Sequence, residues 1–263
     1  MILVFDIGNT ELTIGLFNAE QLRAHWRIVT NVARTPDEFG VLLRSLLVAA
    51  DYGPQFVDGV AIGSVVPWVT GPLVDACSRY LGIARPVVVD GSVSLPIELD
   101  VEEPLTVGAD RIINTLAASR LYGQDAIVVD LGTATTFDCI TADGVFLGGI
   151  IAPGIQTSAE TLTRRTSKLP ATELRPPSRV IGRRTEDCIR AGVMFGAADS
   201  IDGLVKRIKR VWPRPEVPVV IATGGYAEVI APLCTVFDRV EPFLTLQGLQ
   251  IAYDLLIPSN SIV

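Results

Sequence analysis

The chain of 263 residues is long enough for one large domain or two of ordinary size, and its 49% hydrophobic content can fill their cores. A formal charge of −7 disfavours nucleic acid as the main partner, since nucleic-acid backbones attract basic surfaces. No uninterrupted apolar run reaches the ~18 residues that a membrane-spanning helix needs, and the first residues do not resemble a signal peptide. We therefore expect neither nucleic acid nor a membrane as a partner.

The four cysteines are widely spaced: Cys77, Cys139, Cys188 and Cys234. Scattered cysteines without a Cys-x-x-Cys pair are usually reduced core residues. This pattern favours a cytoplasmic location and argues against a zinc site. The lone histidine, His25, lies in the middle of a predicted strand beside Trp26, and we interpret it as structural, which leaves no Ser-His-Asp triad.

Two short polar segments follow apolar runs that we interpret as strands. Residues 1–5 lead into Asp6-Ile7-Gly8-Asn9-Thr10, and residues 126–129 lead into Asp130-Leu131-Gly132-Thr133-Ala134-Thr135-Thr136. In each segment an aspartate ends the strand and a glycine follows two positions later. A carboxylate there can hold a divalent cation, while glycine lets the backbone approach phosphate oxygens. Two such segments indicate a duplicated domain whose halves face one nucleotide.

Each segment opens the same order of predicted elements. Strands at residues 12–17 and 22–29 follow the first turn. Strands at residues 137–141 and 145–147 follow the second, separated by the hairpin signal Ala142-Asp143-Gly144. This correspondence is the strongest sign of duplication.

Helices and further strands alternate after each opening. Thr35-Pro36-Asp37-Glu38 combines a cap, a proline and a glutamate as a helix start does, and apolar residues then recur at helical spacing. The remaining predicted helices cover residues 69–81, 108–122 and 185–210, with a last one that follows residues 241–246 and ends near 256. Further strands are predicted at residues 57–64, 86–89 and 217–222. This alternation implies an α/β fold, with residues 108–122 bridging the halves.

Five motifs, in this order, resemble those of the type III pantothenate kinases. They are residues 6–10, Gly108-Ala109-Asp110-Arg111, residues 130–138, residues 148–154 and Ala222-Thr223-Gly224-Gly225. The resemblance extends from Asp6 to about Tyr253. It implies the fold of the actin, sugar-kinase and chaperone-ATPase superfamily, in which two duplicated ribonuclease-H-like domains enclose a nucleotide cleft. We expect the N-terminal domain at residues 1–115 and the C-terminal domain at residues 116–263.

The reaction implied by this resemblance is the ATP-dependent phosphorylation of the primary hydroxyl of pantothenate. Its product is 4′-phosphopantothenate, and it is the first step of coenzyme A biosynthesis. The resemblance also implies Mg²⁺ with ATP, a monovalent cation (K⁺ or NH₄⁺), and a homodimer whose sites lie near the subunit interface. ATP and pantothenate are the expected small-molecule partners.

The resemblance also assigns residues to the nucleotide. Asp6 would help to hold the magnesium–phosphate complex, and Asp130 would bind the monovalent cation. Thr133 would contact phosphate, and Gly224 with Gly225 would form the adenosine-side loop. The other implied nucleotide contacts are Ile7, Gly8, Asn9, Thr10, Glu11, Leu12 and Thr13. The chain has no G-x-x-x-x-G-K-[ST] loop, so magnesium, backbone amides and the monovalent ion must do the work of that motif's lysine.

Asp110 is the predicted catalytic residue. A carboxylate near the acceptor hydroxyl can orient it and accept its proton, while positioning and electrostatics supply most of the rate. Asp110 could instead cap a helix that begins near Arg111, and both roles could hold together. Gly108 and Ala109 would let the substrate approach the backbone. Arg111 offers a charged fork for the carboxylate of pantothenate, or it could pair with a neighbouring acid.

Thr185 matches a family position that contacts substrate from the neighbouring subunit. It could equally be the N-cap of a helix that starts at Glu186. Asp138 could be structural and ranks below Asp130. The chain departs from the family at Val101, where many members have an aromatic residue, and at Glu11, where a small polar residue is common.

Two alternatives to a pantothenate kinase stay open at this stage. The first keeps the fold and changes the acceptor to another small hydroxy compound, for which Val101 leaves room. The second is an actin-like ATP-binding module that acts as a regulatory partner and needs no base in its cleft. Asp110 distinguishes the second alternative from an enzyme.

Overall fold

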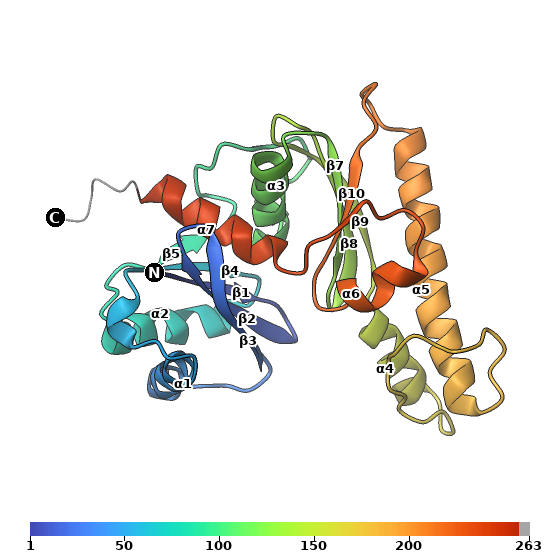
Figure 1. Ribbon diagram of the computed structural model, residues 1–263, viewed down its shortest axis with the longest axis horizontal. Helices are drawn as coiled ribbons and strands as arrows, with labels where there is room; N and C mark the ends of the chain where they lie inside the picture. The colour runs from blue at the N-terminus through green and yellow to red at the C-terminus, as the bar shows by residue number, and fades with distance from the viewer. Residues whose placement is uncertain (258–263) are drawn as a thin grey trace. The chain divides into compact units, whose positions relative to one another are not determined.

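The computed structural model describes residues 1–257, which divide into two compact units (Figure 1). Unit 1 contains residues 1–117 and the C-terminal segment from Thr245, and unit 2 contains residues 118–244. The first boundary falls within a helix, α3 (Ala109–Tyr122). The units thus differ from the expected domains in the C-terminal helix, which groups with the first unit.

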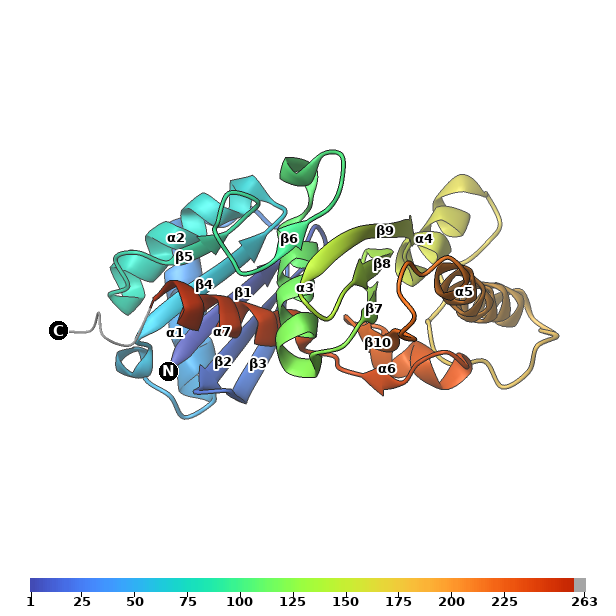
Figure 2. The same cartoon turned by 90° about the horizontal axis from the view of Figure 1, so that it is seen from above.

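Unit 1 is built on a sheet with strand order β3-β2-β1-β4-β5 (Figure 2). The sheet begins with the antiparallel strands β1 (Ile2–Ile7), β2 (Glu11–Asn18) and β3 (Gln21–Val29). β4 (Gly59–Ser64) and β5 (Val87–Val89) then continue it in parallel with β1. Because β1 and β4 are parallel, their carboxyl ends lie at the same edge of the sheet.

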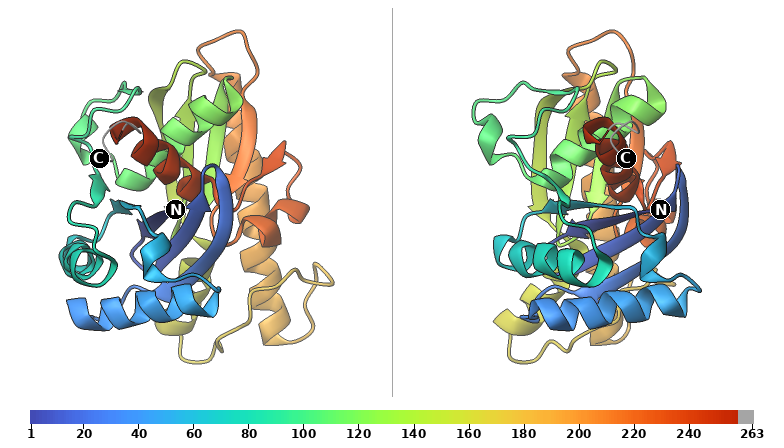
Figure 3. Two further views of the ribbon diagram at one scale, coloured as in Figure 1. Left: turned by 60° about the vertical axis from the view of Figure 1, so that its left-hand side comes forward. Right: turned by 90° about the vertical axis from the view of Figure 1, so that its left-hand side faces the viewer.

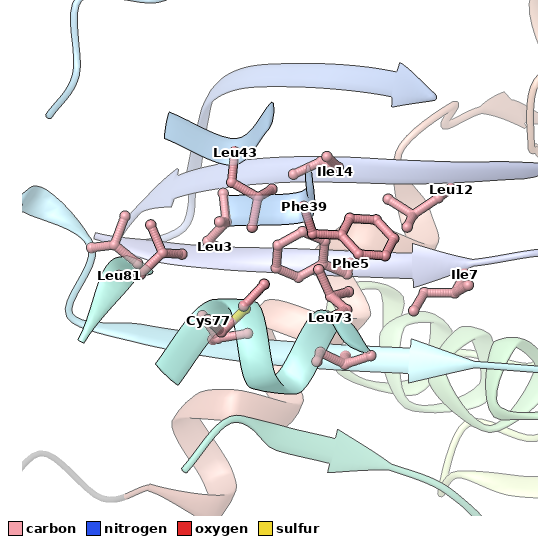
Figure 4. Packing of buried hydrophobic residues seen from close by; sticks show 14 of the residues in the cluster. Leu3, Phe5, Ile7, Leu12, Ile14, Phe39, Leu43, Leu73, Cys77 and Leu81 are labelled. Carbon is pink, nitrogen blue, oxygen red and sulfur yellow. The ribbon is translucent and has the colours of Figure 1, made fainter. Parts of the chain in front are cut away.

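Two helices cover one face of this sheet, α1 (Pro36–Ala49) and α2 (Pro67–Leu81) (Figure 3). The core between them and the strands contains Phe5, Ile14 and Phe39, all at most 2% exposed (Figure 4). The predicted start of α1 is confirmed: the Thr35 hydroxyl accepts from the Glu38 amide at 3.2 Å, and the Glu38 carboxylate accepts from the Thr35 amide at 2.7 Å.

The C-terminal helix α7 (Leu244–Leu256) packs against the strands of unit 1 on the other face. A Cβ atom on Gly15 would lie 3.0 Å from Leu246, and one on Gly63 would lie 3.2 Å from Leu249. Glycines in these strands therefore let the helix approach the sheet closely.

Unit 2 repeats the opening of unit 1. Its strands are neighbours in the order β11-β10-β7-β8-β9. The strands β7 (Ala126–Leu131), β8 (Ala134–Ile140) and β9 (Val145–Pro153) are antiparallel. β10 (Val219–Thr223) lies parallel to β7, and β11 (Arg239–Val240) lies parallel to β10. Both units thus have a three-stranded antiparallel opening continued by a parallel strand, as the predicted duplication requires.

Helices α4 (Ile155–Arg165), α5 (Thr185–Arg210) and α6 (Ala227–Ile230) belong to unit 2. Its core joins residues of β7 and β10 to Met194 and Val205 of α5, both 0% exposed. The remaining short elements are β6 (Glu98–Leu99) and three 3₁₀ turns at Pro54–Phe56, Pro104–Thr106 and Ala231–Leu233.

The helix predicted at residues 185–210 is confirmed as α5, whereas α4 was not predicted. Three predicted elements begin two residues away from their predicted starts. They are the helix at 69–81, which begins at Pro67, and the strands at 57–64 and 217–222, which begin at Gly59 and Val219. No helix within residues 1–257 is long and apolar enough to cross a membrane.

Asp125 ties the start of β7 to the next hairpin and to the segment after α5. Its carboxylate accepts from the Ala142 amide and the Trp212 indole N–H, each at 2.8 Å, and lies 3.6 Å from the Arg214 guanidinium. The residue is only 4% exposed. Three separate segments of unit 2 therefore depend on one buried acceptor.

We expect Asp125→Ala to lower the free energy of unfolding by about 2–4 kcal/mol, since it leaves buried donors without an acceptor. Trp212→Phe removes only the hydrogen bond from the indole N–H to Asp125. The loss of this bond should lower the free energy of unfolding by about 1 kcal/mol. Urea unfolding of both variants measures the two values. A smaller loss for Asp125→Ala than for Trp212→Phe would contradict this account.

Candidate functional site

The first polar segment forms the turn between β1 and β2. The Gly8 amide donates to the Glu11 carbonyl at 3.0 Å, and the side chains of Asn9 and Thr10 are exposed. Asp6 lies opposite Thr13 of β2 in the antiparallel register. Its carboxylate therefore stands on the same face of the sheet as Thr13, one position before the strand ends.

The second polar segment forms a tighter turn between β7 and β8. The Gly132 amide donates to the Ala134 carbonyl at 3.0 Å. The Thr133 carbonyl accepts from the Gly154 amide at 3.2 Å and from the Thr157 hydroxyl at 2.7 Å. The start of α4 therefore holds this turn in place. Asp130 lies opposite Thr136 in the register, as Asp6 lies opposite Thr13.

The Gly224–Gly225 loop lies directly against the second segment. Gly224 has a φ of +88°, and a Cβ there would lie 2.4 Å from Asp130 Oδ1 and 2.8 Å from the Leu131 amide nitrogen. Tyr226 donates its amide to the Leu131 carbonyl at 3.1 Å. Only glycine permits this approach. The structure thus brings together Asp130, Thr133, Gly224 and Gly225, four residues singled out in the sequence.

A cavity of about 430 Å³ lies beside this loop, within the range of small-ligand sites. Tyr226, Gln156 and Glu160 line it. The Tyr226 hydroxyl donates to Gln156 Oε1 at 2.8 Å, and Gln156 Nε2 donates to Glu160 Oε1 at 2.9 Å. Sequence reasoning missed these residues. The one available signal was the position of Tyr226, directly after Gly224–Gly225.

Gly108–Arg111 form the first turn of α3 in unit 1. The amides of Arg111 and Ile112 donate to the Gly108 carbonyl at 3.1 and 3.2 Å. The helix begins at Ala109 and not near Arg111, so Asp110 lies inside the first turn and is not at the N-cap position proposed as its alternative role. Its carboxylate still accepts from the backbone N–H groups of Arg111 and Asp110, as a capping side chain does. A Cβ on Gly108 would lie 2.4 Å from Asp110 Oδ1, which means that the carboxylate folds back over the glycine.

Burial raises the pKa of the Asp110 carboxyl, although backbone N–H groups at Arg111 and Asp110 and the Arg111 charge favour the ionised form. Desolvation makes a carboxylate more basic. A carboxylate in these surroundings is therefore a better proton acceptor than an exposed aspartate.

Thr185 is exposed and is the first residue of α5. The cap position belongs to Arg184, so the alternative role of Thr185 as the N-cap is wrong. Before it, a loop packs on the helix: a Cβ on Gly182 would lie 2.5 Å from the Cys188 amide nitrogen. Val180 and Ile181 of this loop are 72% and 83% exposed.

Solved structures identify the class of fold. The chain is similar to the activator of the 2-hydroxyisocaproyl-CoA dehydratase from Clostridium difficile with bound ADPNP, at 13% identity and a TM-score of 0.57, over 100% of this chain and 97% of that one. Component A of the (R)-2-hydroxyglutaryl-CoA dehydratase of Acidaminococcus fermentans is similar at 12% identity and a TM-score of 0.54, over 95% of this chain and 94% of that one. The protein has the duplicated ribonuclease-H-like fold of the actin, sugar-kinase and chaperone-ATPase superfamily.

Sequence comparison narrows this class to one family. The model of the type III pantothenate kinases matches residues 2–207. The type III pantothenate kinase of Thermomicrobium roseum is 45% identical over 254 residues, which are 97% of each chain. That of Moorella thermoacetica is 41% identical over 254 residues, 97% of this chain and 99% of its own. The chain belongs to the type III pantothenate kinase family.

Proposed function

We propose that this protein transfers the γ-phosphoryl group of ATP to the primary hydroxyl of pantothenate and so begins coenzyme A biosynthesis. The observation that carries the proposal is the family match over residues 2–207, which includes both aspartate turns and Gly108–Arg111. These are the segments to which the family resemblance assigns the phosphates and the acceptor.

Asp110 is the group that accepts the proton of the acceptor hydroxyl. Its raised pKa and its fixed place over Gly108 support this role. Arg111, one residue further along the first turn of α3, binds the carboxylate of pantothenate. Because a guanidinium is permanently charged and planar, it suits an anionic hydroxy acid.

Asp6, at the end of β1, helps to hold Mg²⁺ with the phosphates of ATP. The exposed residues Asn9 and Thr10 in the turn after it offer amide and hydroxyl groups to phosphate oxygens. The Asp6 carboxylate fits Mg²⁺ bound to ATP, since Mg²⁺ in such sites is held by one or two carboxylates and by phosphate oxygens. When bound, the ion neutralises charge that develops on the transferred phosphoryl group.

Asp130 holds the monovalent cation in this proposal. The neighbouring strand supports it: Thr223 lies beside Asp130 in the parallel register, and its buried hydroxyl has no hydrogen-bond partner among residues 1–257. A carboxylate and an adjacent hydroxyl are oxygen donors that fit potassium. The cation would partly offset the negative charge of Asp130 and the phosphates.

The cavity beside Gly224 and Gly225 receives the nucleoside of ATP. The turn at Thr133 lies at the start of α4, and the lining residues Gln156, Glu160 and Thr163 follow along that helix. At 1.5 Å per residue, the stretch from Gly154 to Thr163 spans roughly 14 Å. A nucleotide whose phosphates lie at Thr133 can therefore place its base against Tyr226.

A homodimer completes the proposal, with Thr185 contacting the substrate of the neighbouring subunit. The exposed Val180 and Ile181, a few residues before Thr185, support an interface at this loop. A cytoplasmic location agrees with the four free cysteines. The expectation that they are core residues is wrong for Cys188, which is exposed, and only Cys77 is fully buried.

The test is the transfer of labelled phosphate from ATP to pantothenate, in parallel with potassium or only sodium. We expect 4′-phosphopantothenate in potassium and much less in sodium. ATP hydrolysis without this product would point to another hydroxy compound as acceptor. The absence of both reactions would favour a nucleotide-binding module. Equal rates in both salts would overturn the Asp130 assignment alone.

A further inference from the structure

An arginine of unit 1 stands in line with the first aspartate turn. Asp6 of β1 lies opposite Thr13 of β2, and Thr13 lies opposite Arg27 of β3. Residues directly opposite each other in an antiparallel pair point to the same face of the sheet. Asp6, Thr13 and Arg27 therefore form one row. Their strands β1, β2 and β3 are neighbours in the sheet (Figure 2).

The Arg27 side chain is long enough to reach the turn between β1 and β2. Neighbouring strands are about 4.8 Å apart, so Arg27 starts about 10 Å from Asp6 across the row. Thr13, between them, has a short side chain, and the long arginine side chain can extend over it. The end of β3 is fixed to the turn as well, since the Thr30 amide donates to the Thr10 carbonyl at 2.9 Å.

No polar contact of the Arg27 side chain is seen within residues 1–257. Its side chain is exposed, and it makes no hydrogen bond or ion pair within the described part of the chain. Arg23 on the same strand differs, because its guanidinium donates to Gln21 Oε1 at 2.8 Å. An unpaired guanidinium on the face that carries Asp6 is available for an anionic ligand.

We propose that Arg27 binds the phosphate oxygens of ATP from the edge strand β3 and supplies the fixed positive charge that a phosphate-loop lysine would otherwise provide. This inference rests on the proposed function, since it concerns the same nucleotide. The exposed residues Asn9 and Thr10 offer uncharged donors, and Asp6 and Glu11 add negative charge beside them. A guanidinium in the row offsets that charge where the phosphates lie.

The experiment compares the full-length protein with Arg27→Gln, Arg27→Lys and the control Arg23→Gln. The dissociation constant of MgATP is measured by ligand-induced thermal shift, and KM is measured for ATP and for pantothenate. We expect Arg27→Gln to weaken MgATP binding roughly 10- to 100-fold, the effect of losing one charge-assisted hydrogen bond. The KM for pantothenate should change less than twofold. Arg27→Lys should recover part of the loss, and Arg23→Gln should bind as the unaltered protein does.

An Arg27→Gln variant that binds MgATP within twofold of the unaltered protein would overturn the proposal. So would an equal loss in Arg23→Gln, which would indicate a general effect of surface charge. If Arg27→Gln raised the KM for pantothenate and left the KM for ATP unchanged, Arg27 would be assigned to pantothenate, and the proposal would be overturned. If the proposed function is wrong, the unaltered protein binds MgATP but forms no phosphopantothenate. The comparison of MgATP binding between the variants would then still test the role of Arg27.

Discussion

Asp110→Asn should lower kcat for phosphate transfer to pantothenate by roughly 10²–10⁴-fold, with a much smaller change in the KM for ATP. The amide keeps the shape of the side chain in the first turn of α3, but it cannot accept the proton of the hydroxyl. Steady-state kinetics of the purified variant measure both constants. Asp75→Asn on the exposed face of α2 is the matched control and should leave both constants unchanged.

The same carboxylate predicts a pH dependence. Asp110 acts as a base only when it is ionised, and burial raises its pKa. As the pH falls, the reaction should therefore slow at a higher pH than an ordinary exposed aspartate would require. The acid limb of the kcat profile should be absent from the residual activity of Asp110→Asn. An unchanged limb in that variant would assign the titration to another group.

Gly154→Ala should damage the turn between β7 and β8. A Cβ there would lie 2.3 Å from the Thr133 carbonyl oxygen and 2.5 Å from that of Gly132. Both atoms belong to the backbone, so no side chain can rotate away, and the turn itself must shift. We expect a loss of about 1–3 kcal/mol in the free energy of unfolding and a fall in kcat/KM of roughly 100-fold. Urea unfolding and steady-state kinetics measure the two effects.

Gly192→Ala in α5 is the control for this substitution. A Cβ at Gly192 meets nothing within 4 Å, and alanine is the better helix former. This variant should gain about 0.5–1 kcal/mol of stability with unchanged activity. If Gly154→Ala matched Gly192→Ala in stability and in kcat/KM, the close approach of α4 to the turn would not matter for folding or activity.

The strands and helices with a strong apolar pattern could be predicted from the sequence. The alternation in residues 12–17 and the start at Thr35–Glu38 each produced the expected element. Helix α4 was missed because only Ile155 and Ala159 are buried along it, too few for an apolar stripe. Strand β9 continues to Pro153, well past the predicted end at residue 147. The prediction stopped too early because Gly148 and Gly149 interrupt the apolar pattern typical of a strand.

The parts of the candidate site that lie on short motifs could likewise be predicted. Asp130 and Gly224 were identified from sequence, and the structure places them in contact range. The cavity lining could not be predicted, because Tyr226 and Gln156 meet from positions 70 residues apart. Arg27 lies in an ordinary amphipathic strand, and only the register of β1, β2 and β3 shows that it shares a row with Asp6.

The return of α7 to unit 1 has a consequence for the order of events on the ribosome. Unit 1 is encoded by both ends of the chain, and unit 2 is inserted between residues 117 and 245. The glycines that receive Leu249 and Tyr253 lie in β4, which is synthesised nearly 200 residues earlier. Unit 2 can complete its core while translation continues. Until the last helix emerges, one face of the unit 1 sheet is covered only in part, by Ile113 of α3 at Gly63. A nascent chain stalled before residue 245 should therefore be the form that chaperones bind.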